Sequence, residues 1–172
     1  MKPRVGVSSC LVGQRVRYDG GDKRDQHLID ALAGLVEWVP VCPEVEIGLG
    51  TPRPPINLQQ RPDGVHLIMP STGRDLTDDM RHYAEARVDA LRALGLSGYV
   101  LKSKSPSCGL GSAKTYDEAG VLLNQQGTGL FAEALRRKMP ELPVAEEADL
   151  ADPGRFRQFI ERIKAYSSGR ST

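Results

Sequence analysis

The stretch GYVLKSKSPSCGLG, residues 98–111, joins the two features that decide the fold and the chemistry of this chain. It begins with an apolar run, residues 98–101, of the kind that forms a buried strand. A serine-rich loop that holds Cys108 follows, and Gly109 and Gly111 close it. A cysteine that only packs more often lies inside an apolar run, where it acts as a small hydrophobe. A cysteine just beyond the run indicates a chemical role.

Apolar runs of this kind alternate with amphipathic segments along the whole chain, which is typical of an α/β domain with a mostly parallel sheet. The expected strands are residues 4–8, 38–41, 98–101 and 142–145. The expected helices are residues 24–37, 77–94, 129–138 and 154–166, with Thr77 as the N-cap of the second. Pro40 and Pro143 indicate that two strands are irregular or lie at an edge. The sequence predicts a three-layer, Rossmann-like α/β fold.

The length of 172 residues suits one domain, which we expect over residues 1–166, followed by a disordered tail at residues 167–172. Residues 48–64, GLGTPRPPINLQQRPDG, are rich in Pro and Gly and are expected to form a long irregular excursion before the short strand VHLIM. Loops of this length in compact domains are often functional.

The balance of charge argues against several classes of partner. The chain has 23 Lys and Arg against 22 Asp and Glu, so its formal net charge of +1 creates no general attraction to nucleic acid or to an anionic membrane. It lacks the ~18-residue apolar stretch of a membrane span and the apolar core of a signal peptide. We expect a cytoplasmic protein that binds neither nucleic acid nor membrane.

The three cysteines, Cys10, Cys42 and Cys108, each follow a predicted strand. Because the carboxyl ends of parallel strands meet at one edge of a sheet, the three thiols are expected to lie close together. An odd number of cysteines in the reducing cytosol does not favour a disulfide framework. This placement favours a shared metal site, and the alternative is three unrelated buried cysteines.

Soft thiolate ligands favour zinc or an iron–sulfur cluster. A structural zinc site would need a fourth ligand, but His27 and His82 fall in predicted helices and His66 lies in a predicted strand. Three thiolates without a fourth suit a cubane cluster in which one iron has no protein ligand, although electron-transfer clusters use four cysteines. Such an iron would act as a Lewis acid.

Polar residues accompany each cysteine. If residues 42–46, CPEVE, are extended, Glu44 and Glu46 lie on the same side as Cys42. Glu44 is then a candidate proton donor or water-activating base, whereas Glu46 can equally be a surface residue. The turn VRYDGGD, residues 16–22, brings Tyr18 and Asp19 toward the same edge of the sheet. The serines of the Cys108 loop can donate to sulfide or to a planar heterocycle, or can serve only to form turns.

Taken in order, VGVSSCLVG, VRYDGG, VCPEV, GLGTPRPP, GRDLTDDM, KSKSPSCG and the ending GTGLFAEALRRKMPELPVAEEADL…RFRQFIERI span nearly the whole chain and resemble the thiouracil desulfidase family. The pairing of CPE with KSPSCG is the most specific part of this resemblance. It implies a 4Fe-4S cluster held by three cysteines, whose free iron takes the sulfur of a thiolated pyrimidine of the 2-thiouracil or 4-thiouracil type. The products would be uracil, or a related base, and sulfide, with no redox cofactor.

The resemblance also implies a role for individual residues. Cys10, Cys42 and Cys108 would bind the cluster, Glu44 would be the acid or base, and the Ser105 hydroxyl would assist at the reacting carbon or hold the base. The candidate substrate-binding residues are Ser9, Tyr18, Asp19, Arg53, Ser103 and Ser107. Relatives often carry an acidic residue after TPRxP, where this chain reads TPRPPINLQ, so the loop that would select the substrate differs.

Other functions stay open on the sequence alone. One is a desulfidase for a thionucleoside or thionucleotide, and another is a dehydratase-like Lewis acid. A third is a carrier that passes on sulfur or a cluster without catalysis, and a fourth is a zinc-bound structural module.

Overall fold

The structure is a computed structural model and describes residues 1–170. Its first sheet has the strand order β2-β1-β6-β9, and every neighbouring pair is parallel. The strands are β1 (Arg4–Ser8), β2 (Glu37–Val41), β6 (Gly98–Leu101) and β9 (Val144–Glu146). The strands expected from the sequence are therefore confirmed, although β9 begins only after Pro143. Pro40 lies in β2 and Pro143 directly precedes β9, and both strands lie at an edge of the sheet, as the prolines indicated.

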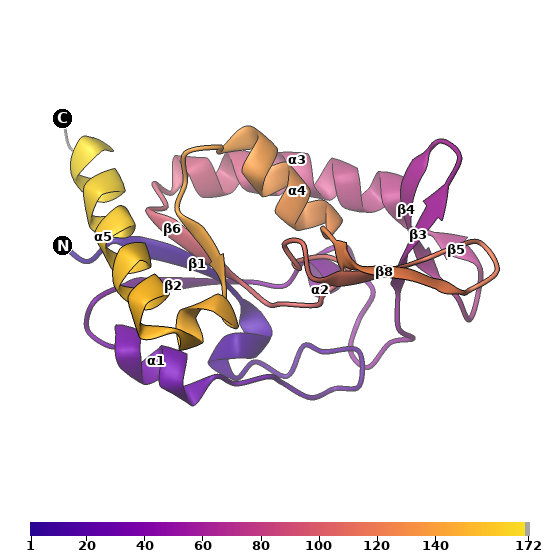
Figure 1. Ribbon diagram of the computed structural model, residues 1–172, viewed down its shortest axis with the longest axis horizontal. Helices are drawn as coiled ribbons and strands as arrows, with labels where there is room; N and C mark the ends of the chain where they lie inside the picture. The colour runs from indigo at the N-terminus through magenta and orange to yellow at the C-terminus, as the bar shows by residue number, and fades with distance from the viewer. Residues whose placement is uncertain (171–172) are drawn as a thin grey trace.

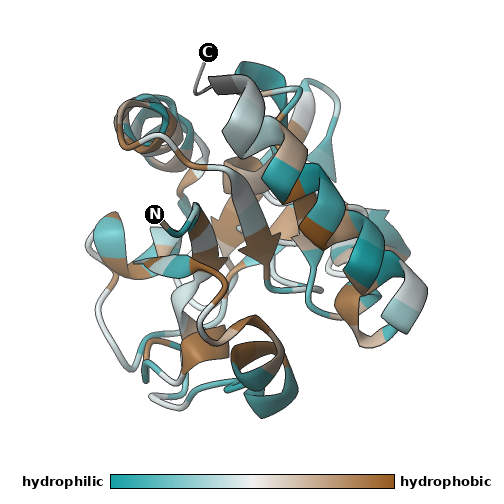
Figure 2. Cartoon of the chain, turned by 90° about the vertical axis from the view of Figure 1, so that its left-hand side faces the viewer, coloured by the Kyte–Doolittle hydropathy of each residue, from teal (hydrophilic) through white to brown (hydrophobic). Residues whose placement is uncertain are grey.

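Helices cover both faces of this sheet (Figure 1). On one face Val5, Val7 and Val100 pack against α1 (Gln26–Leu32) and α5 (Pro153–Arg170). On the other face Tyr99 and Leu101 pack against α3 (Thr77–Ala93) and α4 (Leu130–Lys138). Figure 2 shows apolar strands at the centre and hydrophilic outer faces on the surrounding helices. This is the predicted three-layer α/β arrangement.

A second sheet has the order β5-β4-β3-β7-β8, and of its strands only VHLIM, part of β4, was expected from the sequence. Its strands are β3 (Asn57–Arg61), β4 (Gly64–Met69), β5 (Arg74–Asp75), β7 (Ala113–Tyr116) and β8 (Leu122–Gly127). The prediction that residues 48–64 are irregular throughout is wrong, because residues 57–61 pair with β4 and bury Leu58. One of the two clusters of buried apolar residues includes the buried side of α3 and draws residues from both sheets.

Several helix boundaries differ from those expected. Helix α1 begins after Asp25, whose carboxylate caps it by accepting from the backbone N–H of Leu28, and it ends at Leu32, before residue 37. Thr77 is not an N-cap: its buried hydroxyl accepts from the N–H of Leu67 and donates to Asp75. Helix α5 continues to residue 170, so residues 167–170 of the expected disordered tail are helical, and residues 171–172 lie outside the described residues.

A search of residues 1–170 for a helix that combines the length and the apolar character needed to cross a membrane found none.

Candidate active site

The three cysteines lie at the carboxyl edge of the parallel sheet. Cys10 lies on a short 3-10 helix (Ser9–Val12) directly after β1, Cys42 follows β2 as the N-cap of α2 (Pro43–Glu46), and Cys108 lies on the loop after β6. All three are free thiols. Burial raises the pKa of Cys108, and Cys42 and Cys10 raise it further because each would place a like charge nearby. Burial also raises the pKa of Cys10, to about 11.

The loop that carries Cys108 is fixed by Ser105. The Ser105 hydroxyl oxygen accepts from the backbone N–H groups of Ser107 (3.1 Å) and Cys108 (3.0 Å). The carbonyl of Ser107 then accepts from two N–H groups in the first turn of α4. Gly129, the N-cap of α4, permits this contact, since a Cβ there would lie 2.2 Å from the Ser107 carbonyl carbon. The loop is therefore held against α4 with Cys108 buried.

Glu44 is held by two partners. Its Oε1 lies 3.0 Å from Nη2 of Arg53 and accepts from Nε at 3.1 Å, while its Oε2 accepts from the Ser107 hydroxyl at 3.1 Å. The Arg53 side chain is 3% exposed, so this ion pair is largely removed from solvent. A buried carboxylate paired in this way has a fixed position.

The expectation that residues 42–46 are extended is wrong, because α2 makes one helical turn of Pro43–Glu46. Residues two positions apart do not share a face of a helix. Glu44 therefore faces Arg53 and Ser107, whereas Glu46 turns back to the N–H of Cys42 and to Arg87 on α3. The proline at the first position of the turn favours a helix start over an extended strand.

The donor set suits an iron–sulfur cluster. In residues 1–170 no group of three His, Cys, Asp or Glu side chains is arranged to hold a single metal ion. A four-iron cluster has a different requirement, because each cysteine binds a different iron and the sulfurs need not surround one point. His66, the histidine of the predicted strand, is bonded to Asp75 and Asp63 instead. Three soft thiols on three neighbouring strand ends are the donors that such a cluster needs.

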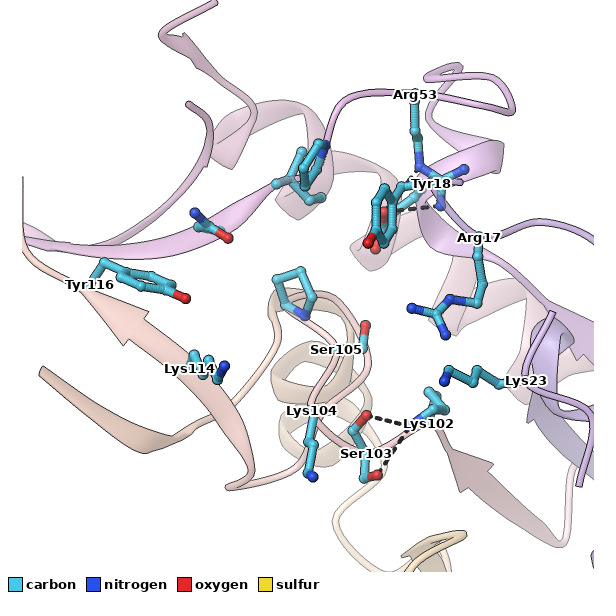
Figure 3. Close-up of a pocket in the computed structure, with 15 residues that line it drawn as sticks. Arg17, Tyr18, Lys23, Arg53, Lys102, Ser103, Lys104, Ser105, Lys114 and Tyr116 are labelled. Carbon is cyan, nitrogen blue, oxygen red and sulfur yellow. Dashed lines mark hydrogen bonds and ion pairs between the residues drawn. The ribbon is translucent and has the colours of Figure 1, made fainter. Parts of the chain in front are cut away.

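A cavity of about 560 Å³ opens beside this edge, between the two sheets (Figure 3). Among the predicted residues, Glu44, Ser105, Tyr18, Arg53 and Ser103 line it. Cys10, Cys42 and Cys108 are not among its lining residues, and neither are three of the predicted polar residues. Ser9 and Ser107 are buried, and Asp19 accepts from the N–H of Gly21 in its own turn.

The cavity wall is cationic, which the sequence analysis missed. Figure 3 shows Arg17, Lys23 and Lys102 on one side and Lys114 with Tyr116 on the other. Lys104 also lines the cavity, and Glu44 is the one carboxylate among the described lining residues. The chain's small net charge conceals this local excess. The lysines of LKSKS were a readable signal, but Lys114 and Tyr116 lie on β7, which was not predicted.

Comparison with known proteins gives consistent results. The profile of the 2-thiouracil desulfurase family matches residues 5–147, which include all three cysteines. The solved structure of the 4Fe-4S-dependent thiouracil desulfidase TudS matches with a TM-score of 0.69 and 35% identity, over 87% of this chain and 94% of that chain. The uncharacterized protein YbbK of Bacillus subtilis (strain 168) is 31% identical over 142 residues, which are 74% of this chain and 93% of that protein. This chain therefore belongs to the 2-thiouracil desulfurase family.

Proposed function

We propose that this protein is a cytoplasmic, iron–sulfur-dependent desulfidase that converts a thiolated pyrimidine of the 2-thiouracil or 4-thiouracil type to uracil and sulfide. The observation that carries the proposal is that three thiols follow the neighbouring strands β2, β1 and β6 at one sheet edge, beside a cavity that Glu44 and Ser105 line. Membership of the family and the likeness to TudS support it.

The reaction needs water and no oxidant or reductant. The C=S carbon gains a C–O bond from water and loses its C–S bond, so its oxidation state does not change and hydrogen sulfide is the second product. Cys10, Cys42 and Cys108 would hold a 4Fe-4S cluster whose iron without a protein ligand supplies Lewis acidity toward the substrate sulfur. The protein's own residues must then orient the pyrimidine and move protons.

Glu44 is the group that moves the proton. Arg53 and Ser107 hold both of its carboxylate oxygens and fix it at the cavity wall, where it takes a proton from the attacking water and returns one to the leaving sulfur. Ser105 has a different task. Because its oxygen already accepts from two backbone N–H groups, its hydroxyl hydrogen is left to donate into the cavity, toward an oxygen or nitrogen of the pyrimidine.

A thionucleotide is the second candidate substrate, and the cationic wall favours it. The five lining cations apart from Arg53 are Arg17, Lys23, Lys102, Lys104 and Lys114. Glu44 is already paired with Arg53, and of the five Lys102 is paired with Glu147, just outside the lining. An uncharged base has no need of so many cations, whereas a phosphate group is bound by Lys and Arg in this way. The size of the cavity also leaves room beyond the base.

The first test is iron and acid-labile sulfide in protein purified and reconstituted without oxygen. We expect both in the ratio of a cubane cluster, and we expect Cys108→Ala to lose them together. Turnover of thiouracil, 4-thiouridine and 4-thiouridine monophosphate then separates the substrates. Protein that binds only zinc, or no metal, would overturn the proposal. Transfer of sulfide or cluster to an acceptor without turnover of any thiopyrimidine would replace it with a carrier function.

A further inference from the structure

Both backbone polar groups of Cys42 are bonded to one residue, Glu46. The N–H of Cys42 donates to Oε2 of Glu46 at 3.0 Å, and the carbonyl of Cys42 accepts from the N–H of Glu46 at 2.9 Å. The thiol of Cys42 makes no capping bond to the helix that it precedes. In a capping box, a glutamate in the first turn of a helix accepts a hydrogen bond from the N–H of the N-cap residue. Glu46 makes this kind of bond with Cys42.

The same carboxylate connects Cys42 to a long helix. Its Oε1 lies 2.9 Å from Nε of Arg87 on α3, and the two side chains are 31% and 27% exposed. That nitrogen is buried and has no aligned hydrogen-bond partner among the described residues, so the Glu46 carboxylate beside it compensates the burial of its charge. Ala84, Val88 and Leu91, which neighbour Arg87 on the surface of α3, are completely buried and fix this part of the helix in the core. Arg87 therefore extends from a rigid element.

Helix α2 needs such an anchor. It has four residues, and one helical turn has no stability of its own in water, because the cost of nucleation is not recovered. The other two cysteines are fixed differently. Ser105 and α4 hold the loop of Cys108, and the carbonyl of Cys10 accepts from the N–H groups of Lys23 and Gly13. The bonds of Glu46 are the ones that reach the Cys42 backbone itself, while Glu44 ties the same turn to Arg53 and Ser107 and the Cys42 thiol lies 3.9 Å from the Val16 carbonyl.

We propose that Glu46 and Arg87 are positioning residues that hold Cys42 where it can act as a cluster ligand. The inference rests on the proposed function, since it takes Cys42 as a ligand. Groups that orient a metal ligand without touching the metal commonly change metal affinity by 10–100-fold. Arg87 acts through Glu46, so the effects on iron affinity of removing each side chain should not add up when both are removed.

The experiment measures the rate at which anaerobically reconstituted protein releases iron to a chelator. We expect Glu46→Ala and Arg87→Ala to release iron about tenfold faster than the wild type, and the double variant to be no faster than Glu46→Ala. Glu46→Gln retains an acceptor for the Cys42 N–H and loses the charge that pairs with Arg87, so its rate should be intermediate.

A control separates positioning from general stability. Arg74→Ala removes a more exposed ion pair with Asp79 at the other end of α3, and it should release iron at the wild-type rate. Thermal unfolding of the metal-free variants provides a second readout. Iron release at the wild-type rate from loaded Glu46→Ala overturns the inference and leaves the proposed function intact, as does a rate change that simply follows the unfolding temperature. Wild-type protein that loads no iron overturns both.

Discussion

Ser107 donates a hydrogen bond of 3.1 Å to Oε2 of Glu44, and this bond joins two loops that are 63 residues apart in the sequence. One loop follows β2 and carries Cys42, and the other follows β6 and carries Cys108. The proposed acid–base group is thus fixed by the same two loops that hold two of the proposed ligands. A substitution that keeps this bond can test the chemistry of Glu44 without moving either cysteine.

Glu44→Gln is that substitution. The amide oxygen still accepts from Ser107, while the pair with Arg53 is lost and Arg53 keeps its bonds to Gly50 and Thr51. An amide neither takes up nor releases a proton, so we expect turnover to fall by about 10²–10⁴-fold with iron content unchanged. Iron analysis and single-turnover assays on the same sample check this. Glu118→Gln, a change at an exposed residue, is the control. Full activity of Glu44→Gln would remove Glu44 from the mechanism.

Ser105→Ala should lower kcat by about 10²-fold, the loss typical of one hydrogen-bond donor at a reacting centre. It also leaves two backbone N–H groups without their acceptor, so we expect a loss of about 1–3 kcal/mol in the free energy of unfolding. Iron content distinguishes the two effects. A fully loaded Ser105→Ala variant with wild-type kcat would limit Ser105 to a structural role.

Lys104→Ala and Lys114→Ala test the second candidate substrate. If the cavity wall binds a phosphate, each change raises KM for 4-thiouridine monophosphate by about tenfold, with little change for thiouracil, and the difference shrinks as salt is added. Lys164→Ala on α5 is the matched control away from the cavity. Equal effects on the charged and uncharged substrates would argue against phosphate binding.

His66 should make stability depend on pH. Its ring nitrogens lie 2.7 Å from Asp75 and 2.8 Å from Asp63, and these hydrogen bonds raise the pKa of His66 above its usual 6.5. A raised pKa means that the folded state holds the proton more tightly. The contribution of these two bonds to the free energy of unfolding is therefore complete below pH 6.5, and it is lost as the pH rises through the pKa of His66 in the folded state.

The measurement is the unfolding free energy of metal-free wild type and His66→Gln as a function of pH. The difference between them should be larger at pH 6 than at pH 9. A difference that does not change with pH, or that grows as the pH rises, would contradict this assignment.

Gly129→Ala should disturb the Cys108 loop from outside the cavity. The added Cβ would lie 2.2 Å from the Ser107 carbonyl carbon and 2.7 Å from the Cys108 nitrogen, so backbone atoms must move. We expect a loss of about 1–3 kcal/mol in the free energy of unfolding, together with weaker retention of iron. Gly154→Ala at the start of α5 meets only a carboxylate oxygen and should change neither. Unchanged stability and iron content in Gly129→Ala would mean that the loop adjusts freely.

The parallel sheet was predictable because each of its strands is a short apolar run, and the three cysteines followed from those runs. The second sheet was not. Its strand NLQQR is mostly polar and lies in a segment rich in Pro and Gly, and only Leu58 enters the core. Strand β8, LLNQQG, is almost wholly exposed, so neither strand gives the alternation that marks a half-buried strand.

The candidate site divides in the same way. Glu44 and Ser105 were accessible from the sequence because they lie beside the cysteines. The turn of α2, which separates Glu44 from Glu46, was missed because four residues carry no periodic signal and the proline was not read as a helix start. Lys114 and Tyr116 reach the cavity only because β7 pairs with β3, a long-range contact that local patterns do not encode.

The cavity lies between two sheets that contribute different kinds of residue to it. Loops at the carboxyl edge of the parallel sheet bring Glu44 and Ser105, whereas Asn57, Lys114 and Tyr116 come from the second sheet. Part of the wall that would choose the substrate is thus encoded apart from the loops that carry the cysteines and Glu44. Within such a family, β3 and β7 can diverge, or be exchanged between members by design, while the cysteine loops keep their sequence.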